Sequence, residues 1–354
     1  MARRMVIPVV LSLPLLAWAQ VSDSALVTSP PYSEPLPARI DLWLGIAPAF
    51  RAPLKVPESA LLAHQEELNL RSDAALVLNQ EDGQLLYAKN TNAVMPIASI
   101  TKLMTAMVIL DSGLPLDDPI TIMREDLDKL KGTGSRLRVG VTLSRREMLR
   151  LALMASENRA AAALARNYPG GTGAFVETMN QKAKQVGMHD TRYVDATGLN
   201  PNNVSTALDL ALLVNAGYRY ALIREYSTTQ SVRLPFRGGR TSRALAFRNS
   251  NGLVRSGQWE IGLQKTGYIR EAGRCLVMQA RVSDKPVIIV LLNSWDRHTR
   301  IADANRIRRW VEALPAPRSA PAWLELKAPP GYSLNAIAES GYGGHVLSMP
   351  LPKR

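Results

Sequence analysis

Cysteine and long apolar runs are scarce in this sequence. Cys275 is the only cysteine among the 354 residues, so no intramolecular disulfide can form and stability must come from a packed core. We expect this residue to be a small apolar side chain on a strand rather than a reactive thiol. Beyond the N-terminal segment, nothing approaches the roughly 20 uninterrupted apolar residues of a membrane-spanning helix. The sequence therefore predicts a soluble domain without a stable membrane anchor.

Signatures of metal-dependent and histidine-dependent hydrolysis are also missing. The four histidines show no metal-ligand spacing, which argues against a zinc peptidase; they are His64, His189, His298 and His345. No Gly-x-Ser-x-Gly segment is present, so the nucleophile elbow of a histidine-dependent serine hydrolase is not indicated either. We expect no metal and no cofactor.

Acidic residues are fewer than basic ones, and a predicted export signal limits the partners that this positive charge can have. Asp and Glu number 30 against 43 Lys and Arg, which gives a formal net charge of +13. Residues 1–19 combine a basic start, an apolar run from Val6 to Ala17 and small residues around Ala19, the pattern of a secretory signal peptide. Export to the periplasm removes nucleic acid as a partner, although the charge alone would suggest it. A basic surface there suits anionic cell-wall polymer or lipid headgroups.

The rest of the chain divides into three segments by composition. Residues 20–70 form a Pro- and Ser-containing N-terminal arm without a sustained period. Residues 316–354 form a Pro-rich C-terminal tail that is too short for a second domain. Residues 71–315 carry the periodic patterns of a folded domain.

Within residues 71–315, strands at both ends enclose a helical middle. We expect a β-hairpin over 74–88, and then helices over 99–111, 144–156, 158–166, 174–186, 206–217 and 301–311. Ser144 and Glu147 have the spacing of a capping box. Four late segments indicate neighbouring antiparallel strands: 231–234, 261–268, 274–280 and 287–292. This order predicts an α/β domain whose sheet brings its two ends together.

A serine and a lysine lie one helical turn apart in an otherwise apolar helix. Ser99 and Lys102 project from the same face, and the helix offers Lys102 no obvious side that faces water. An apolar setting lowers the pKa of a lysine, and a neutral amine within hydrogen-bond reach can take the serine proton. Ser-x-x-Lys alone is expected about once by chance in a chain of this length. In this setting it predicts an activated nucleophile.

Two further motifs follow in order. Ser156-Glu157-Asn158 lies between two predicted helices, where a hydroxyl can relay a proton and the amide can bind a substrate carbonyl or hold the lysine. A helix cap is the alternative explanation of this segment. Lys265-Thr266-Gly267 ends a predicted strand, where Lys and Thr can bind a carboxylate and Gly allows a ligand backbone to approach closely.

The order Ser-x-x-Lys, Ser-x-Asn, Lys-Thr-Gly resembles the active-site signature of penicillin-binding proteins and serine β-lactamases. With Gly134-Ser135-Arg136 and Asp195-Ala196-Thr197-Gly198-Leu199, the chain is similar to the low-molecular-mass D-alanyl-D-alanine peptidases of the S11 family. Among these it is similar to the D-alanyl-D-alanine endopeptidases of the penicillin-binding protein 7 group. The resemblance implies a serine β-lactamase/D,D-peptidase-like α/β fold, an antiparallel sheet flanked by helices with an inserted all-helical region.

The same resemblance implies a role for each motif residue. Ser99 is the acylated nucleophile, Lys102 its general base, and Ser156 the residue that passes a proton to the leaving amine. The backbone N–H groups of Ser99 and Tyr268 form the oxyanion hole. The implied substrate-binding residues are Asn158, Lys265, Thr266 and Gly267. The implied partners are peptidoglycan cross-links, in which D-alanine is joined to meso-diaminopimelate, and β-lactams, which would acylate Ser99.

Three alternatives stay open at this stage. Glu157 and the Tyr268-Ile269-Arg270-Glu271 segment favour the endopeptidases over the D-alanyl-D-alanine carboxypeptidases, and this choice depends on resemblance alone. A class A β-lactamase would need a Glu-x-x-Leu-Asn segment, whereas the corresponding region reads Arg192-Tyr193-Val194-Asp195. A non-catalytic wall-binding or β-lactam-sensing protein would have no need of the complete set of motif residues. The sequence identifies no partner among the proteins of the wall machinery.

Overall fold

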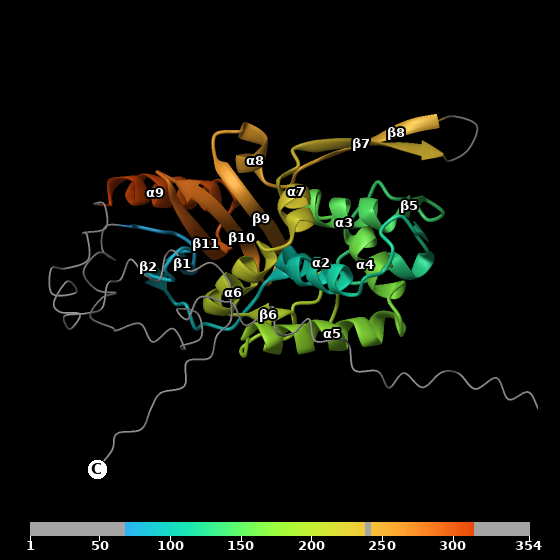
Figure 1. Cartoon of the computed structure of the whole chain (residues 1–354), viewed down its shortest axis with the longest axis horizontal. Helices are drawn as coiled ribbons and strands as arrows, with labels where there is room; N and C mark the ends of the chain where they lie inside the picture. The colour runs from blue at the N-terminus through green and yellow to red at the C-terminus, as the bar shows by residue number, and fades with distance from the viewer. Residues whose placement is uncertain (1–67, 238–241, 315–354) are drawn as a thin grey trace, which may run out of the picture. The chain divides into compact units, whose positions relative to one another are not determined.

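The computed structural model describes residues 68–237 and 242–314 (Figure 1). The predicted signal peptide, the predicted tail and nearly all of the predicted arm lie outside these residues. In this part of the chain, no helix has both the length and the apolar character to cross a membrane. The same residues contain no group of three or more His, Cys, Asp or Glu side chains placed to hold a metal ion.

A five-stranded antiparallel sheet joins the two ends of the domain, as the sequence predicts. Its strand order is β2-β1-β11-β10-β9, so the first hairpin pairs with the last strand. The strands are β1 (Ala74–Asn79), β2 (Leu85–Lys89), β9 (Glu260–Ile269), β10 (Gly273–Val282) and β11 (Lys285–Ser294). β1 lies antiparallel to β11, with Ala74 opposite Leu292 and Asn79 opposite Val287. The predicted fold class is confirmed.

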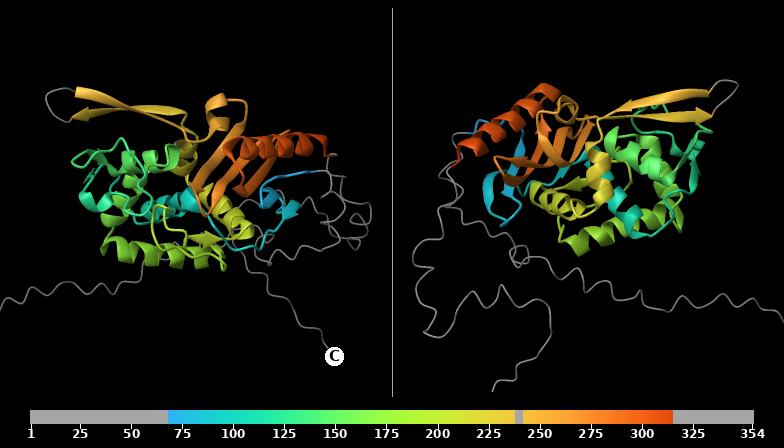
Figure 2. Two further views of the ribbon diagram at one scale, coloured as in Figure 1. Left: turned by 180° about the vertical axis from the view of Figure 1, so that it is seen from behind. Right: turned by 45° about the horizontal axis from the view of Figure 1, so that its top comes forward.

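The central strands are apolar at nearly every position because both faces of the sheet are covered. In β11, the odd-numbered residues from Val287 to Leu291 pack in one cluster with residues of α9 (Arg297–Ala313). The even-numbered residues from Ile288 to Leu292 are equally buried, and α6 (Ala207–Gly217) contacts β1, β10 and β11. Figures 1 and 2 show α9 and α6 on opposite sides of the sheet.

Cys275 on β10 is fully buried, and burial raises the pKa of its thiol to about 11. Its predicted role as a small apolar residue is confirmed.

The helical middle begins with a short 3-10 turn rather than with an α-helix at Ser99. η4 (Ala98–Thr101) leads into α2 (Lys102–Asp111), in which every residue from Lys102 to Ile109 is buried. The predicted capping box is confirmed at the start of α3 (Arg145–Met154), where the backbone N–H of Ser144 donates to Glu147 Oε2 over 2.8 Å. The remaining helices of the described chain are η5 (Arg124–Asp126), α4 (Asn158–Arg166), α5 (Gly171–Val186), α7 (Ala221–Thr228) and α8 (Gly252–Ser256).

The predicted strand at 231–234 does not join the sheet. It belongs to β7 (Ser231–Arg237), which pairs with β8 (Ser242–Arg248) in a separate two-stranded ribbon. The expectation of four neighbouring strands is wrong for this segment, because the alternation of side chains along one strand does not identify its partner strand. Two shorter antiparallel pairs join β3 (Met95–Pro96) to β6 (Val204–Ser205) and β4 (Pro119–Thr121) to β5 (Thr142–Ser144). The sequence did not predict β8, α7 or α8.

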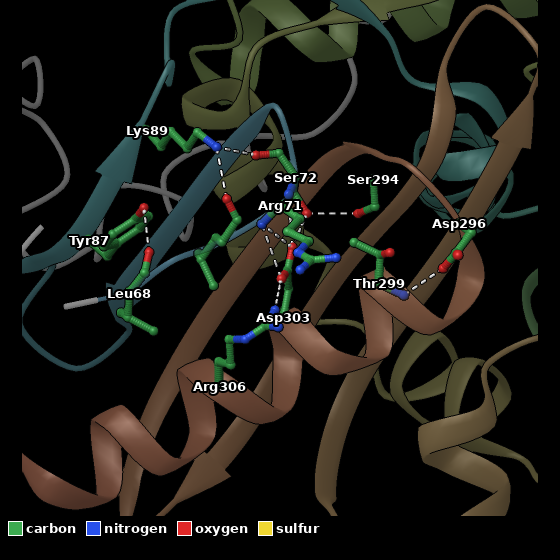
Figure 3. A network of polar contacts seen from close by, with 11 residues as sticks. Leu68, Arg71, Ser72, Tyr87, Lys89, Ser294, Asp296, Thr299, Asp303 and Arg306 are labelled. Carbon is green, nitrogen blue, oxygen red and sulfur yellow. Dashed lines mark hydrogen bonds and ion pairs between the residues drawn. The ribbon is translucent and has the colours of Figure 1, made fainter. Parts of the chain in front are cut away.

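A buried carboxylate on α9 fixes the chain segment that leads into β1 (Figure 3). Asp303 is fully buried and accepts hydrogen bonds from the backbone N–H groups of Arg71 (3.0 Å) and Ser72 (2.8 Å) and from Ser72 Oγ (2.8 Å). Arg306 forms an ion pair with the same carboxylate over 2.6 Å. From the other side, Lys89 Nζ on β2 donates to the carbonyl oxygen of Ser72 over 2.8 Å. The last helix thus holds the entry to the first strand.

Replacing Asp303 by Ala should destabilise the domain by about 3 kcal/mol, because two backbone donors and one hydroxyl lose a buried acceptor. Urea unfolding of the full chain, followed by circular dichroism, measures this loss. Asp296→Ala is the matched control, since Asp296 caps the same helix from an exposed position. An equal loss of stability in the two variants would contradict the importance of the buried network.

Candidate active site

The three motifs lie on elements that are far apart in sequence and meet at one place. Ser99 lies in η4 and Lys102 begins α2, Ser156 lies between α3 and α4, and Lys265 lies on β9, which contacts η4. Lys102 Nζ lies 2.8 Å from Ser99 Oγ and 2.8 Å from Asn158 Oδ1. Lys265 Nζ lies 2.8 Å from Ser156 Oγ. The structure brings together the motif side chains that the sequence predicted as catalytic and two of those predicted to bind substrate.

The surroundings of Lys102 determine what its amine can do. The residue is fully buried, and its Nζ has three neighbours: Ser99 Oγ, Asn158 Oδ1 and, at 2.6 Å, the carbonyl oxygen of Thr197. The oxygens of Asn158 and Thr197 can only accept hydrogen bonds, so they take the two N–H groups of a neutral amine. Its lone pair is then left for the hydroxyl proton of Ser99.

Burial also sets the protonation of Lys102 near neutral pH. Desolvation lowers the pKa of this amine to about 7, although the carboxylates of Asp195 and Glu157 attract the charged form and raise the pKa in part. An amine with a pKa near 7 is often neutral at neutral pH and can act as a general base. The hydrogen-bond partners of Lys102 and its lowered pKa therefore both fit a general base for Ser99.

A second buried lysine supports the serine of the second motif. Lys265 is fully buried, and its Nζ donates to Ser156 Oγ and to the carbonyl oxygen of Thr266, each over 2.8 Å. Burial lowers the pKa of Lys265 well below its usual value, and the positive charges of Lys102 and Arg300 lower it further. Ser156 itself has a left-handed backbone with φ of 60°, which is uncommon for a residue other than Gly. The left-handed conformation of Ser156 makes the turn between α3 and α4.

Two glycines from different elements pack directly on the backbone of the nucleophile. A Cβ on Gly198, whose φ is +79°, would overlap the carbonyl group of Ala98 and lie 2.9 Å from Ser99 N. A Cβ on Gly267 of β9 would lie 2.9 Å from the carbonyl oxygen of Ile97 and 3.2 Å from Ser99 N. Ala98 between them has a left-handed φ of 48°. Only glycines allow β9 and the 195–199 segment to approach Ser99 this closely.

Asp195 folds the segment that presents Gly198 and the Thr197 carbonyl group. Its Oδ1 accepts hydrogen bonds from Thr197 N (2.5 Å), Thr197 Oγ1 (2.7 Å) and Gly198 N (2.7 Å), and its Oδ2 accepts one from Asn200 N (2.9 Å). An Asp that binds the backbone two and three residues further on is a strong local turn signal. From sequence alone, this stretch is only a mark of resemblance; in the structure it shapes the site.

The loop formed by residues 128–140 is attached to the second motif. Asn158 Nδ2 donates to Thr133 Oγ1 over 2.9 Å, so both ends of this amide have partners within the protein. Ser135 Oγ donates to Glu157 Oε2 over 2.6 Å, and burial raises the pKa of the Glu157 carboxyl. From sequence alone, Glu157 is only a mark of the endopeptidase group. The structure shows that it connects the loop to the site.

The end of β9 forms the open side of the site. Thr266 Oγ1 lies 2.6 Å from Ser250 Oγ, a neighbour that the sequence did not predict. The Tyr268 side chain is 54 % exposed, and the Arg274 guanidinium lies 4.1 Å from the centre of its ring. Gly267, the residue before Tyr268, packs close to the Ser99 backbone. The oxyanion hole of the Ser99 and Tyr268 N–H groups stays a prediction.

Gly198→Ala should lower the rate constant for acylation by a penicillin about 100-fold, because the new Cβ must displace the Ala98–Ser99 backbone from its position. Stopped-flow measurement of acylation in the full chain gives this rate. Gly173→Ala, at a helical position where a Cβ meets no atom within 4 Å, should leave the rate unchanged. A Gly198→Ala variant that folds and acylates like the parent would contradict the packing argument.

Comparison with known proteins gives the family of this chain. Residues 61–295 match the model of peptidase family S11, described as D-alanyl-D-alanine carboxypeptidase. A D-alanyl-D-alanine endopeptidase of Pseudomonas aeruginosa is 49% identical over 273 residues, which cover 77% of this chain and 87% of that protein. A D-alanyl-D-alanine endopeptidase of Escherichia coli is 42% identical over 280 residues, which cover 78% of this chain and 90% of that protein.

Solved structures show the same fold. The Streptomyces K15 DD-transpeptidase superposes with a TM-score of 0.65 at 29% identity, over 69% of this chain and 98% of that one. Penicillin-binding protein D2 of Listeria monocytogenes, in its cefotaxime-bound form, gives a TM-score of 0.59 at 30% identity, over 68% of this chain and 97% of that one. The match to the family model, the close relatives and the meeting of the three motifs lead to one conclusion. This chain belongs to the S11 family of serine-type D-Ala-D-Ala peptidases.

Proposed function

We propose that this protein is a penicillin-sensitive serine D,D-endopeptidase that opens D-alanyl-meso-diaminopimelate cross-links of peptidoglycan in the periplasm. The observation that carries the proposal is the buried amine of Lys102, whose two acceptor neighbours leave its lone pair for Ser99. The two bacterial relatives named as endopeptidases support the choice of reaction. The signal peptide predicted over residues 1–19 supports the location.

Acylation begins when Lys102 takes the hydroxyl proton of Ser99. Ser99 Oγ then attacks the carbonyl carbon of the D-alanyl residue, and the C=O bond becomes a C–O⁻ bond in a tetrahedral intermediate. The backbone N–H groups of Ser99 and Tyr268 donate to this oxygen and stabilise its charge. Asn158 positions the substrate: its Nδ2 exchanges Thr133 Oγ1 for a substrate carbonyl oxygen, while its Oδ1 stays on Lys102.

Collapse of the intermediate breaks the bond to the amine of diaminopimelate. Ser156 gives its proton to this amine and recovers one from Lys102, with Lys265 Nζ holding the Ser156 hydroxyl in place. Lys265 and Thr266 bind the carboxylate on the leaving side. Water then attacks the carbonyl carbon of the acyl-enzyme and gives a proton to the neutral Lys102. The bond to Ser99 Oγ breaks as Lys102 returns that proton to it, and the D-alanyl product leaves as a carboxylate after its acid ionises. A β-lactam would follow the same first step and remain attached, because its leaving amine stays tethered to the acyl group.

Ser99→Ala should abolish monomer release from cross-linked muropeptide dimers, by at least about a thousandfold, because the acyl-enzyme cannot form. Mass spectrometry of dimers incubated with the full chain after removal of its signal peptide measures the product. Ser283→Ala, at an exposed serine in the turn between β10 and β11 and outside the site, is the matched control and should keep full activity. Loss of D-Ala from pentapeptides with intact dimers would instead identify a carboxypeptidase. Unchanged dimers and pentapeptides would favour the binding or sensing function.

The pH dependence of acylation should report the protonation of Lys102. Because only the neutral amine accepts the Ser99 proton, the rate should rise with pH through the pKa of about 7 and fall as Lys102 becomes protonated below it. Glu157→Gln removes a carboxylate that raises this pKa, so the acid limb should move to lower pH. Glu271→Gln removes an exposed carboxylate beyond the loop and should leave the limb in place. A limb that stays fixed in Glu157→Gln would contradict the assignment of Lys102 as the base.

A further inference from the structure

The β7–β8 ribbon lies in the most one-sidedly basic part of the chain. Between Glu225 and Glu260 the sequence contains no Asp or Glu. It contains six arginines in the same stretch: Arg233, Arg237, Arg240, Arg243, Arg248 and Arg255. They account for nearly half of the formal net charge of +13. Neither the fold nor the proposed chemistry explains why this charge is concentrated here.

The ribbon has one packed face and one face open to solvent. Leu234 and Phe247 lie on the packed face and are 5% and 2% exposed. Arg233 and Arg248 lie on the opposite face and are exposed, because successive side chains of a strand point to opposite faces. Arg136, from the 128–140 loop, lies over the Phe247 ring at 5.7 Å and holds the packed face to that loop. Within the described residues, neither Arg233 nor Arg248 forms an ion pair. Figures 1 and 2 show the ribbon running past α3 and beyond the helices around it.

The base of the ribbon is bonded to the active site. Immediately after β8, the backbone N–H of Ser250 donates to the carbonyl oxygen of Met154, two residues before Ser156, over 2.9 Å. Ser250 Oγ lies 2.6 Å from Thr266 Oγ1. The ribbon therefore starts at the residues to which the proposed mechanism assigns the leaving side of the substrate, Ser156 and Thr266.

From this position and charge, we infer that the β7–β8 ribbon binds the peptide strand that leaves when a cross-link is opened, through the carboxylates of that strand. The inference depends on the proposed endopeptidase function. After cleavage between D-alanine and diaminopimelate, the leaving product is a whole stem peptide, which carries free carboxylates beyond the scissile bond. A carboxypeptidase releases a single D-alanine, which ends at Thr266 and would not reach an extended basic surface.

A membrane is the less suitable partner for this face. Binding to a bilayer combines basic charge with apolar side chains that enter the acyl boundary. The described residues on the open face are small, polar or basic, and they include no large apolar side chain: Ser231, Arg233, Pro235, Ala244, Ala246 and Arg248. Positive charge without large apolar side chains fits a hydrated anionic peptide, and its attraction is weakened by salt.

The double substitution Arg233→Gln with Arg248→Gln tests the inference in the full chain. We expect kcat/KM for cross-linked muropeptide dimers to fall about tenfold at low salt, mainly through KM, and to converge with the parent value at high salt. Acylation by a penicillin, which has no leaving strand, should not change. A pair with the same loss of charge, Arg219→Gln with Arg309→Gln, alters exposed arginines outside the ribbon and should retain dimer hydrolysis.

Each other outcome has a distinct meaning. Dimer hydrolysis equal in the two double variants, or a parallel loss of penicillin acylation in the ribbon variant, would overturn the inference. Unchanged dimer hydrolysis with lost binding to vesicles that contain anionic phosphatidylglycerol would show a membrane contact instead and would also overturn it. A parent protein that opens no dimers would overturn the proposed function, together with the inference that depends on it.

Discussion

The burial of the Lys102 amine is the constraint on which the site depends. An amine inside the protein loses its hydration, and the fold compensates with two acceptor oxygens and the hydroxyl of Ser99 at 2.6 to 2.8 Å. These contacts leave desolvation dominant, so the pKa falls to about 7 instead of staying near its usual value. The same burial that costs folding free energy thus makes the amine a base at neutral pH.

The second lysine extends the same constraint. Lys102 and Lys265 are both fully buried, and after burial itself the positive charge of Lys102 further lowers the pKa of Lys265. Burial of both lysines favours neutral amines. A neutral amine suits a reaction in which Ser99 loses its proton and a proton later reaches the leaving amine through Ser156. Ser156, placed next to Lys265, is the hydroxyl through which this exchange can run.

Close backbone packing around Ser99 stores local strain. Ala98 and Ser156 adopt left-handed conformations with φ of 48° and 60°, each at a cost of roughly 1–3 kcal/mol. Gly198 and Gly267 hold the nucleophile from two sides, and Asp195 fixes the turn that carries the first of them. The network of Asp303 with Ser72, far from the chemistry, closes the sheet whose edge strand carries Lys265. The packing of the sheet and its helices stabilises the domain and so offsets the free-energy cost of the left-handed residues at the site.

Much of the site could be predicted from local sequence. Ser99 and Lys102 are three residues apart where η4 leads into α2, so their contact follows from helical geometry in either helix type. The capping box at Ser144 marks its helix in the same way. The conformations of Ala98 and Ser156 gave no signal, because neither residue type marks a left-handed backbone as glycine does.

Tertiary structure decided the contacts that span the chain. Thr197 reaches Lys102 across 95 residues and Ser250 reaches Thr266 only because separate elements pack together. The partner of the strand at 231–234 was predicted wrongly for a related reason: alternation shows which side chains share a face, and pairing depends on which strand arrives beside it. The sequence by itself therefore determined the reactive groups and their local spacing. Only the tertiary structure decided their burial, their acceptors and the position of the basic ribbon beside them, because desolvation and long-range packing depend on every element that surrounds a residue.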